Sequence, residues 1–316
     1  MKRRAAALYV AALFVLAATT CSCGGDAPAA AAPKRASAPA WADAFDGTPD
    51  LYAVIRPQAM KRDGLYGAFF KALVRAAVAR GIARGDTMVR AVEGAEEIIV
   101  GLNKGLDAAL VLRGVPASLD PQKITDAEGH VLFRPKSDRA RAVEYELYDR
   151  KSADAGALFV LPDRTWVGTL GGARERARQA FAAPRGRPVP EVDPDALVVV
   201  RVGGPLAHAL DRHPVYGAVT QKLSSATFAL KPGKGGLVVG LSYPDADATA
   251  WAEMHVKRLI DELAKDDVAA GRGGAAPAWL KDARVAYEGN TVVVRVAVPP
   301  RLLEELPSAS GADFGF

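Results

Sequence analysis

The sequence predicts a duplicated α+β protein that follows an N-terminal export segment. An apolar run near the N-terminus comes after basic residues, two short sequence blocks occur twice in the same order, and strand-like and helix-like hydrophobic patterns alternate in each half. The chain has 316 residues, of which 50% are hydrophobic. A chain of this length and composition can build its core without disulfide bonds.

The first residues have the composition of a secretory signal. Lys2, Arg3 and Arg4 precede an apolar run over residues 5–18, and small residues with two cysteines follow. The run is shorter than the roughly 20 residues that a membrane-spanning helix needs. We therefore interpret residues 1–23 as a cleaved signal peptide, with an uncleaved membrane anchor as the alternative.

The end of this segment resembles the lipobox of bacterial lipoproteins, in which a peptidase cuts before a cysteine that carries a diacylglyceryl group. Cys23 follows Ser22, the small residue that the motif requires, whereas Cys21 follows Thr20, which fits less well. Neither cysteine has the usual leucine three residues before it. The resemblance implies lipid attachment at Cys23, with Cys21 as the alternative. The other alternative is an ordinary secretory signal that is cleaved near Ala18.

The same resemblance implies that the mature protein is held at a membrane by its N-terminal lipid. Neither cysteine is followed directly by aspartate, because Gly24 follows Cys23 and Ser22 follows Cys21. By analogy with lipoprotein sorting, this favours the periplasmic side of the outer membrane over the inner membrane. Without acylation the protein would be secreted.

The charge of the mature part is nearly balanced. Removal of residues 1–22 takes away three basic residues and no acidic ones, so the 41 lysines and arginines fall to 38 against 36 aspartates and glutamates. The arginines are scattered rather than interleaved with aromatic residues, which argues against nucleic-acid binding. Arg174, Arg176 and Arg178 are interpreted as a solvated helix face. No cysteine follows Cys23, so the folded part has no disulfide framework and no thiolate site.

Two blocks of sequence are repeated in the same order. PDLYAVIR at residues 49–56 matches PDALVVVR at 194–201, and YGAFFKAL at 66–73 matches YGAVTQKL at 216–223. We infer a gene duplication. The predicted organisation is a disordered Ala- and Pro-rich tether at 24–48, repeat 1 at 49–183, a Pro-rich linker at 184–193, repeat 2 at 194–306 and a C-terminal tail at 307–316.

Hydrophobic periodicity and turn residues predict the elements of each repeat. Repeat 1 is expected to contain a strand at 49–56, a helix at 64–79, a hairpin of strands 98–102 and 108–112, a strand at 143–148 and a closing hairpin that turns at 162–164. Repeat 2 is expected to contain a strand at 194–201, a hairpin of strands 226–230 and 237–241, a helix at 247–265 and a closing hairpin that turns at 289–290. The extra residues of repeat 1 around 81–96 predict an additional helix or an extended loop.

Two of these elements show their pattern clearly. In the strand at 143–148, Val143, Tyr145 and Leu147 alternate with Glu144, Glu146 and Tyr148, which places the two sets on opposite faces. In the helix at 247–265, one face carries apolar residues. They are Ala248, Ala252, Val256, Leu259 and Leu263.

The order strand, helix, hairpin, helix, strand resembles the ferredoxin-like βαββαβ sandwich with added hairpin strands. The resemblance implies two antiparallel sheets, each with helices on one face. It is architectural, so no function follows from it.

No catalytic, cofactor or metal site is predicted. His208 and His213 are five residues apart, whereas a zinc pair on a helix needs a spacing of three or four. His130 and His255 are interpreted as structural. Other residues without an assigned chemistry are Ser242, which lacks the flanking pattern of a nucleophile, Gly233, Gly235 and Gly236, which fit a hairpin turn, and Glu93, Glu96 and Glu97, which fit solvated charges before a strand.

The repeat itself marks two speculative binding residues. Arg56 and Arg201 end the matched strands, where each side chain could reach an anionic partner, with a polar strand end as the alternative reading. We therefore expect a non-catalytic binding or assembly module of the cell envelope, without cofactors. Its partners would be the membrane, through the lipid, and an envelope protein or a small ligand, but no nucleic acid. The alternative is a periplasmic hydrolase with its site between the two repeats.

Overall fold

The computed structural model describes residues 39–45, 49–79, 85–103, 107–125, 129–139, 142–147, 156–183, 189–208, 211, 216–269 and 282–298. The predicted signal peptide with Cys21 and Cys23, the tail at 307–316 and His213 lie outside these ranges. Within them the chain is a mixed α+β protein built on antiparallel strands. It divides into two units, the second of which begins its main segment at Asp193 and also takes in Asp63–Phe69.

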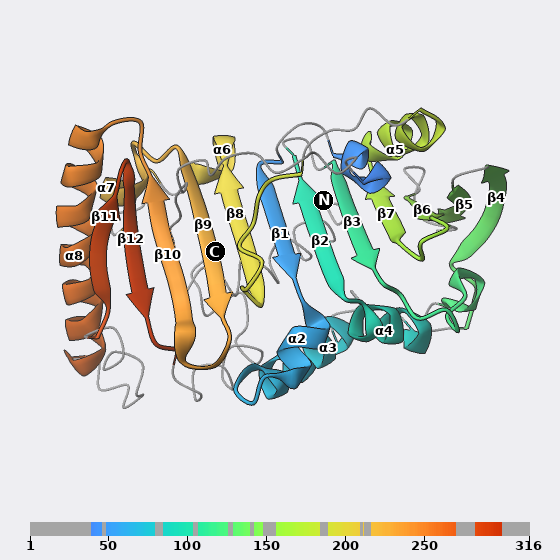
Figure 1. Cartoon of the computed structure of the whole chain (residues 1–316), viewed down its shortest axis with the longest axis horizontal. Coiled ribbons are helices and arrows are strands. Elements are labelled where there is room, and N and C mark those ends of the chain that lie inside the picture. Colours follow the sequence, from blue (N-terminus) through green and yellow to red (C-terminus); the bar gives the residue numbers. More distant parts are fainter. Residues whose placement is uncertain are drawn as a thin grey trace. The chain divides into compact units, whose positions relative to one another are not determined.

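Unit 1 carries a sheet in the order β1-β2-β3-β7-β6-β5-β4, and neighbouring strands are antiparallel (Figure 1). Its strands are β1 (Leu51–Ile55), β2 (Glu97–Leu102), β3 (Ala108–Arg113), β4 (Phe133–Arg139), β5 (Ala142–Leu147), β6 (Ala157–Val160) and β7 (Trp166–Leu170). Its helices are η1 (Ala40–Ala44), α2 (Pro57–Arg62), α3 (Tyr66–Ala79), α4 (Gly85–Gly94), η2 (Pro121–Lys123) and α5 (Ala173–Ala182), and the first residues of α3 are grouped with unit 2. The predicted helix at 64–79 and the additional helix around 81–96 are confirmed as α3 and α4.

The predicted hairpins of unit 1 form where turn residues separate apolar runs. In the first, Ile99 lies opposite Val111 across β2 and β3. The closing hairpin turns tightly between β6 and β7, where the Asp163 carboxylate accepts a hydrogen bond of 3.0 Å from the Thr165 amide. Arg164 takes a positive φ of 64° in this turn. An aspartate side chain that bonds the backbone two residues on is a known way to fix such a turn.

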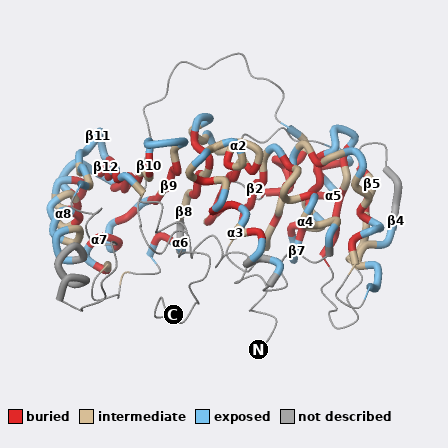
Figure 2. The backbone as a smooth tube through the Cα atoms, turned by 90° about the horizontal axis from the view of Figure 1, so that it is seen from below, coloured by how far each residue is buried: buried red, intermediate tan, exposed pale blue. Residues whose placement is uncertain are grey.

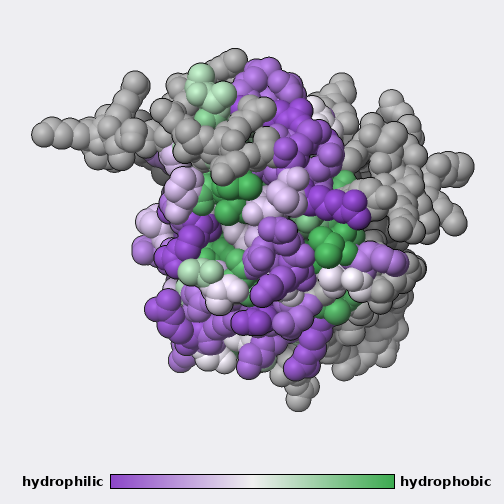
Figure 3. Space-filling model, turned by 90° about the vertical axis from the view of Figure 1, so that its right-hand side faces the viewer, coloured by the Kyte–Doolittle hydropathy of each residue, from purple (hydrophilic) through white to green (hydrophobic). Residues whose placement is uncertain are grey.

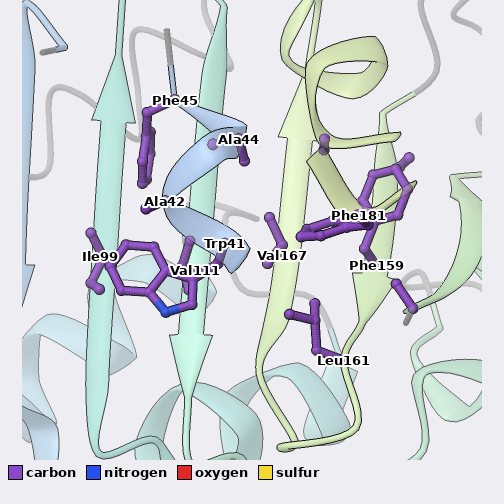
Figure 4. Packing of buried hydrophobic residues seen from close by; sticks show 14 of the residues in the cluster. Trp41, Ala42, Ala44, Phe45, Ile99, Val111, Phe159, Leu161, Val167 and Phe181 are labelled. Carbon is purple, nitrogen blue, oxygen red and sulfur yellow. The ribbon is translucent and has the colours of Figure 1, made fainter. Parts of the chain in front are cut away.

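The core of unit 1 is organised around η1, which corrects the prediction of a disordered tether up to residue 48. Trp41 and Phe45 are 4% and 5% exposed and contact one another edge to face, with ring centroids 6.2 Å apart (Figure 4). A Cβ at Gly101 of β2 would lie 2.4 Å from the Phe45 ring, so the glycine lets the ring approach the strand. The Ala- and Pro-rich composition of the segment concealed two aromatic anchors that gain more from burial than the segment loses on ordering.

Unit 2 carries a sheet in the order β8-β9-β10-β12-β11, again with antiparallel neighbours. Its elements are β8 (Val198–Gly203), α6 (Gly204–Ala207), α7 (Gly217–Thr220), β9 (Ser225–Lys231), η3 (Gly233–Gly235), β10 (Gly236–Ser242), α8 (Ala246–Ala269), β11 (Arg284–Glu288) and β12 (Thr291–Val296). Helix α8 packs on β11 and β12 (Figure 2). Ala248, Ala252 and Val256 are buried along its inner face, which confirms the predicted stripe at these positions.

The ferredoxin-like strand order is not what either unit shows. In a split βαβ unit the strands joined by the first helix are parallel and a third strand lies between them. Here β1 pairs directly with β2, and β8 directly with β9, in the antiparallel sense. The reason is visible in Figure 1, where α2, α3 and α4 lie at the end of β1 rather than crossing a face of the sheet. The chain therefore enters β2 from the end at which it left β1.

Candidate functional site

Strand β5 points an acidic side chain into unit 1. Glu144 is only 1% exposed, whereas Val143, Tyr145 and Leu147 are partly exposed. The alternation itself is present, and the face that carries Glu144 is the inner one. Burial of a carboxylate is unfavourable unless charged partners accompany it, so the neighbours of Glu144 decide what this cluster is.

Two arginines of α5 supply those partners. Arg178 donates from Nη2 to Glu144 Oε1 at 2.6 Å and from Nε to Oε2 at 3.1 Å. Arg174, one helical turn earlier, donates from Nη2 to Glu144 Oε1 at 3.3 Å and to Glu146 Oε1 at 2.8 Å. Residues four apart share a helix face, so both guanidinium groups reach the same strand.

The charges of this cluster shift the protonation of its members consistently. Burial raises the pKa of Glu144, but the hydrogen bonds and charges of Arg178 and Arg174 outweigh it, so the pKa is lowered overall. Hydrogen bonds from Arg174 and Lys136 lower the pKa of Glu146. The bond to Glu144 raises the pKa of Arg178. Glu144, Glu146 and Arg178 are therefore charged at neutral pH.

The third arginine of α5 is also engaged. Arg176 Nη1 donates to Asp107 Oδ2 at 3.0 Å, and Asp107 Oδ1 accepts from the Gly172 amide at 2.8 Å. The side chains of Arg174, Arg176 and Arg178 are 17%, 25% and 23% exposed. The interpretation of these arginines as a solvated helix face is therefore wrong. They hold α5 to β5 and to the start of β3, and their charges are compensated within unit 1.

The predicted binding residue Arg56 lies in a second charged cluster, at the ends of β1, β2 and β3. Arg56 Nε donates to Glu97 Oε1 at 3.1 Å, and Arg113 Nη1 donates to the other oxygen of Glu97. The side chains of Arg56, Glu97 and Arg113 are 15%, 21% and 44% exposed. We call these three residues the Arg56 triad. Glu97 is paired with both arginines and is not the solvated charge that the sequence suggested.

A buried phenol lies close to the Arg56 triad. Tyr52 is 1% exposed, and its hydroxyl has no hydrogen-bond partner among the described residues. Burial raises the pKa of Tyr52, and the nearby Glu97 carboxylate raises it further. The hydroxyl therefore stays protonated and neutral. Arg113 is the most accessible member of the triad and the point at which an anionic group could be received.

The other predicted binding residue, Arg201, is part of β8 and lies opposite Thr227 of β9. It is partly exposed. Arg56, by contrast, follows the last residue of β1. The two matched arginines thus differ in their position relative to the strand, and Arg56 forms an ion pair with Glu97.

His208, His255 and Ser242 make local contacts. His208 Nδ1 is 3.1 Å from Asp211 Oδ2, in a pair whose side chains are 46% and 30% exposed. His255 Nδ1 is 2.9 Å from the Trp251 carbonyl, and the two rings stack at 4.0 Å. Ser242 Oγ lies 3.4 Å from Thr291 Oγ1 in the interior. These contacts fit surface pairing, helix packing and strand packing, respectively.

The remaining described surface offers few chemical groups for a ligand. A shallow depression runs along α8, where Lys257 bonds to Glu253 and Arg258 to Glu262, each at 2.8 Å. Among the described residues there is no group of three or more potential metal ligands. None of the helices described has the length and hydropathy that crossing a membrane requires.

Comparison with known proteins gives a likeness of fold. The chain matches no protein-family model and none of the curated proteins. Among solved structures it resembles crystal form III of TP0453, with a TM-score of 0.52 and 9% sequence identity over 85% of this chain and 98% of that chain. It also resembles crystal form I of TP0453, with a TM-score of 0.51 and 10% identity over 84% and 96% of the two chains. Identities this low show a shared fold alone.

Proposed function

We propose that this chain is an exported, lipid-anchored protein of the cell envelope that acts as a non-catalytic binding or assembly module. The observation that carries the proposal is the N-terminal segment, in which basic residues, a short apolar run and Ser22 lead to Cys23. The lipid would hold the protein on the periplasmic side of the outer membrane. The surface that binds a partner would lie in the folded residues that follow this N-terminal segment.

The charged clusters of unit 1 support a role without chemistry. A catalytic acid or base needs a proton that it can exchange near neutral pH. Glu144 and Glu146 are instead held in their charged forms by arginine and lysine. Their basic partners, Arg174, Arg178 and Lys136, are held in the same ion pairs. The cluster on α5 therefore supports a structural role, and the Arg56 triad, in which the Arg113 side chain is 44% exposed, is the better candidate for contact with an anionic partner.

The two units support the proposed duplication. In each, a first strand leads through helices to its antiparallel neighbour, a third strand follows, and the closing hairpin joins the sheet through its second strand, β7 on β3 and β12 on β10. Val54 of β1 and Val199 of β8, which the sequence blocks align, lie in corresponding first strands. Strands β4 and β5 extend unit 1 beyond this shared pattern. A duplicated module with one elaborated copy suits a protein that presents surfaces to partners.

Lipid attachment is tested by fatty-acid labelling in a bacterial host that processes lipoproteins. The Cys23→Ala variant should accumulate as an unprocessed precursor without label, and Cys21→Ala is the matched control that should be processed and labelled normally. Cell fractionation should place the labelled protein with the outer membrane. If Cys21→Ala abolishes labelling instead, the attachment site moves to Cys21. Soluble, unlabelled mature protein from the unaltered chain would overturn the proposal.

A further inference from the structure

Among the described residues, the outer strand of the unit 2 sheet, β11, has a neighbouring strand on one edge only. It pairs with β12 on one side and ends the strand order of its sheet. Arg284, Ala286, Tyr287 and Glu288 are all exposed, and Tyr287 is exposed to 64%. An edge strand of this kind carries backbone N–H and C=O groups that are ready to pair with another strand.

The outer strand of unit 1 differs, because it is protected. Strand β4 contains Pro135, which cannot donate a backbone hydrogen bond, and its pairing with β5 shifts register between Pro135 and Ser137. Lys136 adds a charge at the same place. Figure 3, which looks onto the side of unit 1 where β4 lies, shows hydrophilic residues over most of the described surface. Proline, a bulge and lysine are the usual means of preventing strand addition, and β11 has none of them.

The turn between β11 and β12 fixes which backbone groups of β11 point outward. Glu288 and Thr291 lie opposite one another and are separated only by Gly289 and Asn290, with Gly289 at a φ of 59°. The closing pair of such a two-residue turn is hydrogen-bonded, and hydrogen-bonded pairs alternate along an antiparallel ladder. Arg284, Ala286 and Glu288 therefore bond to β12. The backbone groups of Val285 and Tyr287 face outward.

The charges along β11 are complementary to a second copy of the same strand. If two β11 strands pair antiparallel about a twofold axis at Ala286, Val285 of one copy lies opposite Tyr287 of the other, so that their outward N–H and C=O groups bond to each other. Arg284 then lies opposite Glu288 of the other copy, in a pair without backbone hydrogen bonds, where side chains approach most closely. Symmetry repeats both contacts, as an isologous interface requires.

Within a single copy, the Arg284 side chain is in an electrostatically unfavourable position. It lies directly opposite Arg295 of β12, and like charges in this position repel. The Arg295 side chain is bonded to Glu288 at 2.9 Å, whereas the Arg284 side chain makes no hydrogen bond or ion pair with another described residue. The second carboxylate oxygen of Glu288 from another copy would supply the missing partner.

We propose that two copies of this protein associate through β11, which joins their unit 2 sheets edge to edge. Helix α8 contacts β11 and β12, yet Ala286, Tyr287 and Glu288 of β11 remain exposed beside it. The interface is small, and anchoring in one membrane would raise the effective concentration of the two copies. The inference depends on β11 alone and not on the proposed lipid attachment.

The register is tested by disulfide cross-linking of the full chain in cell membranes. Ala286→Cys places one thiol opposite its own copy at a Cα separation that a disulfide can span. We expect oxidation to convert this variant to a covalent dimer. Arg284→Cys is the matched control, because its own copy lies several residues away along the paired strands, and it should stay monomeric, as should the unaltered chain. Equal cross-linking of both variants, or none of Ala286→Cys, would overturn the proposal.

Charge exchange separates pairing from a change in folding. On the Ala286→Cys background, Arg284→Glu places two glutamates in opposition, and Glu288→Arg places two arginines in opposition, so each should lower the yield of dimer several-fold. Co-expression of the two variants pairs Glu with Arg at both positions and should restore the dimer as a mixed species. Failure of mixing to restore it contradicts the proposed register. If the dimer forms although Cys23 is not acylated, that result supports pairing through β11 and contradicts the proposed lipid anchoring.

Discussion

Helices α5 and α8 are attached to their units by opposite physical means. α5 is held by three arginines that reach carboxylates on β5 and at the start of β3, with Ala177 and Phe181 buried beside them. α8 is held by the small apolar stripe of Ala248, Ala252 and Val256, and its charged pairs lie within the helix.

The comparison shows what a buried charge contributes. Ion pairs fix the position of α5 along β5, because only one placement satisfies both guanidinium groups. Replacement of such a network by apolar residues can be neutral, yet loss of one partner leaves the others buried and uncompensated. An apolar stripe tolerates small shifts and loses stability in proportion to the surface removed. The predicted effects follow from this difference.

The largest effect is expected at Glu144. Glu144→Gln keeps the size of the side chain but removes the charge that Arg174 and Arg178 share. The free energy of unfolding should fall by about 3 kcal/mol, because breaking a buried pair costs roughly 3–5 kcal/mol. Denaturant unfolding followed by circular dichroism measures it. Glu175→Gln is the control, since its side chain is 63% exposed and its loss should change little. Equal effects of the two changes would mean that the buried network contributes no special stability.

A smaller effect is expected on α8. Val256→Ala removes two methyl groups from a side chain that is 5% exposed, and should lower the free energy of unfolding by about 2 kcal/mol through lost burial and the cavity left behind. The effect should be the same at low and high salt, because it comes from lost apolar burial. Met254→Ala, at a position 60% exposed, is the matched control and should be close to neutral. A strong salt dependence at Val256 would show that α8 is not held by its apolar stripe.

Acid should weaken α5 more than α8. The pKa of Glu144 is lower in the folded protein than its ordinary value of 4.5, so its contribution to stability is fully present above that value. It is lost as the pH falls through the lowered pKa, when the carboxylate takes up a proton. Unfolding free energies measured from pH 6 downward should therefore decline less steeply in Glu144→Gln than in the unaltered chain. Parallel profiles would place the acid-sensitive groups elsewhere.

The smallest effect is expected from the surface pairs of α8. Lys257→Ala removes an ion pair to Glu253 in which the lysine is 55% exposed. Pairs of this kind contribute roughly 0.3–0.5 kcal/mol within a helix. The change in unfolding free energy should lie within that range and vanish at high salt. A loss above about 1 kcal/mol would imply that Lys257 supports more than its helix.

Local elements could be predicted from the sequence because their signals are local. The hairpins β2–β3 and β9–β10, the helices α3 and α8 and the extra helix α4 formed where turn residues and apolar spacing indicated them. Strand β5 kept its predicted alternation, since side chains on a strand must point to opposite faces. Val54 and Val199, from the first matched block, both lie in strands, β1 and β8 respectively.

The tertiary structure alone decided which way those elements face and what they pair with. Alternation fixes two faces but not which one is buried, and Glu144 turned inward because arginines 30 and 34 residues later in the chain lie over it. Trp41 joined the core, and β2 paired directly with β1, through contacts that no local window of sequence contains. The sequence by itself determined where strands, helices and turns form, because propensity and periodicity act over a few residues. The pairing of charges and strands depends on groups brought together only by folding, and the tertiary structure settled it.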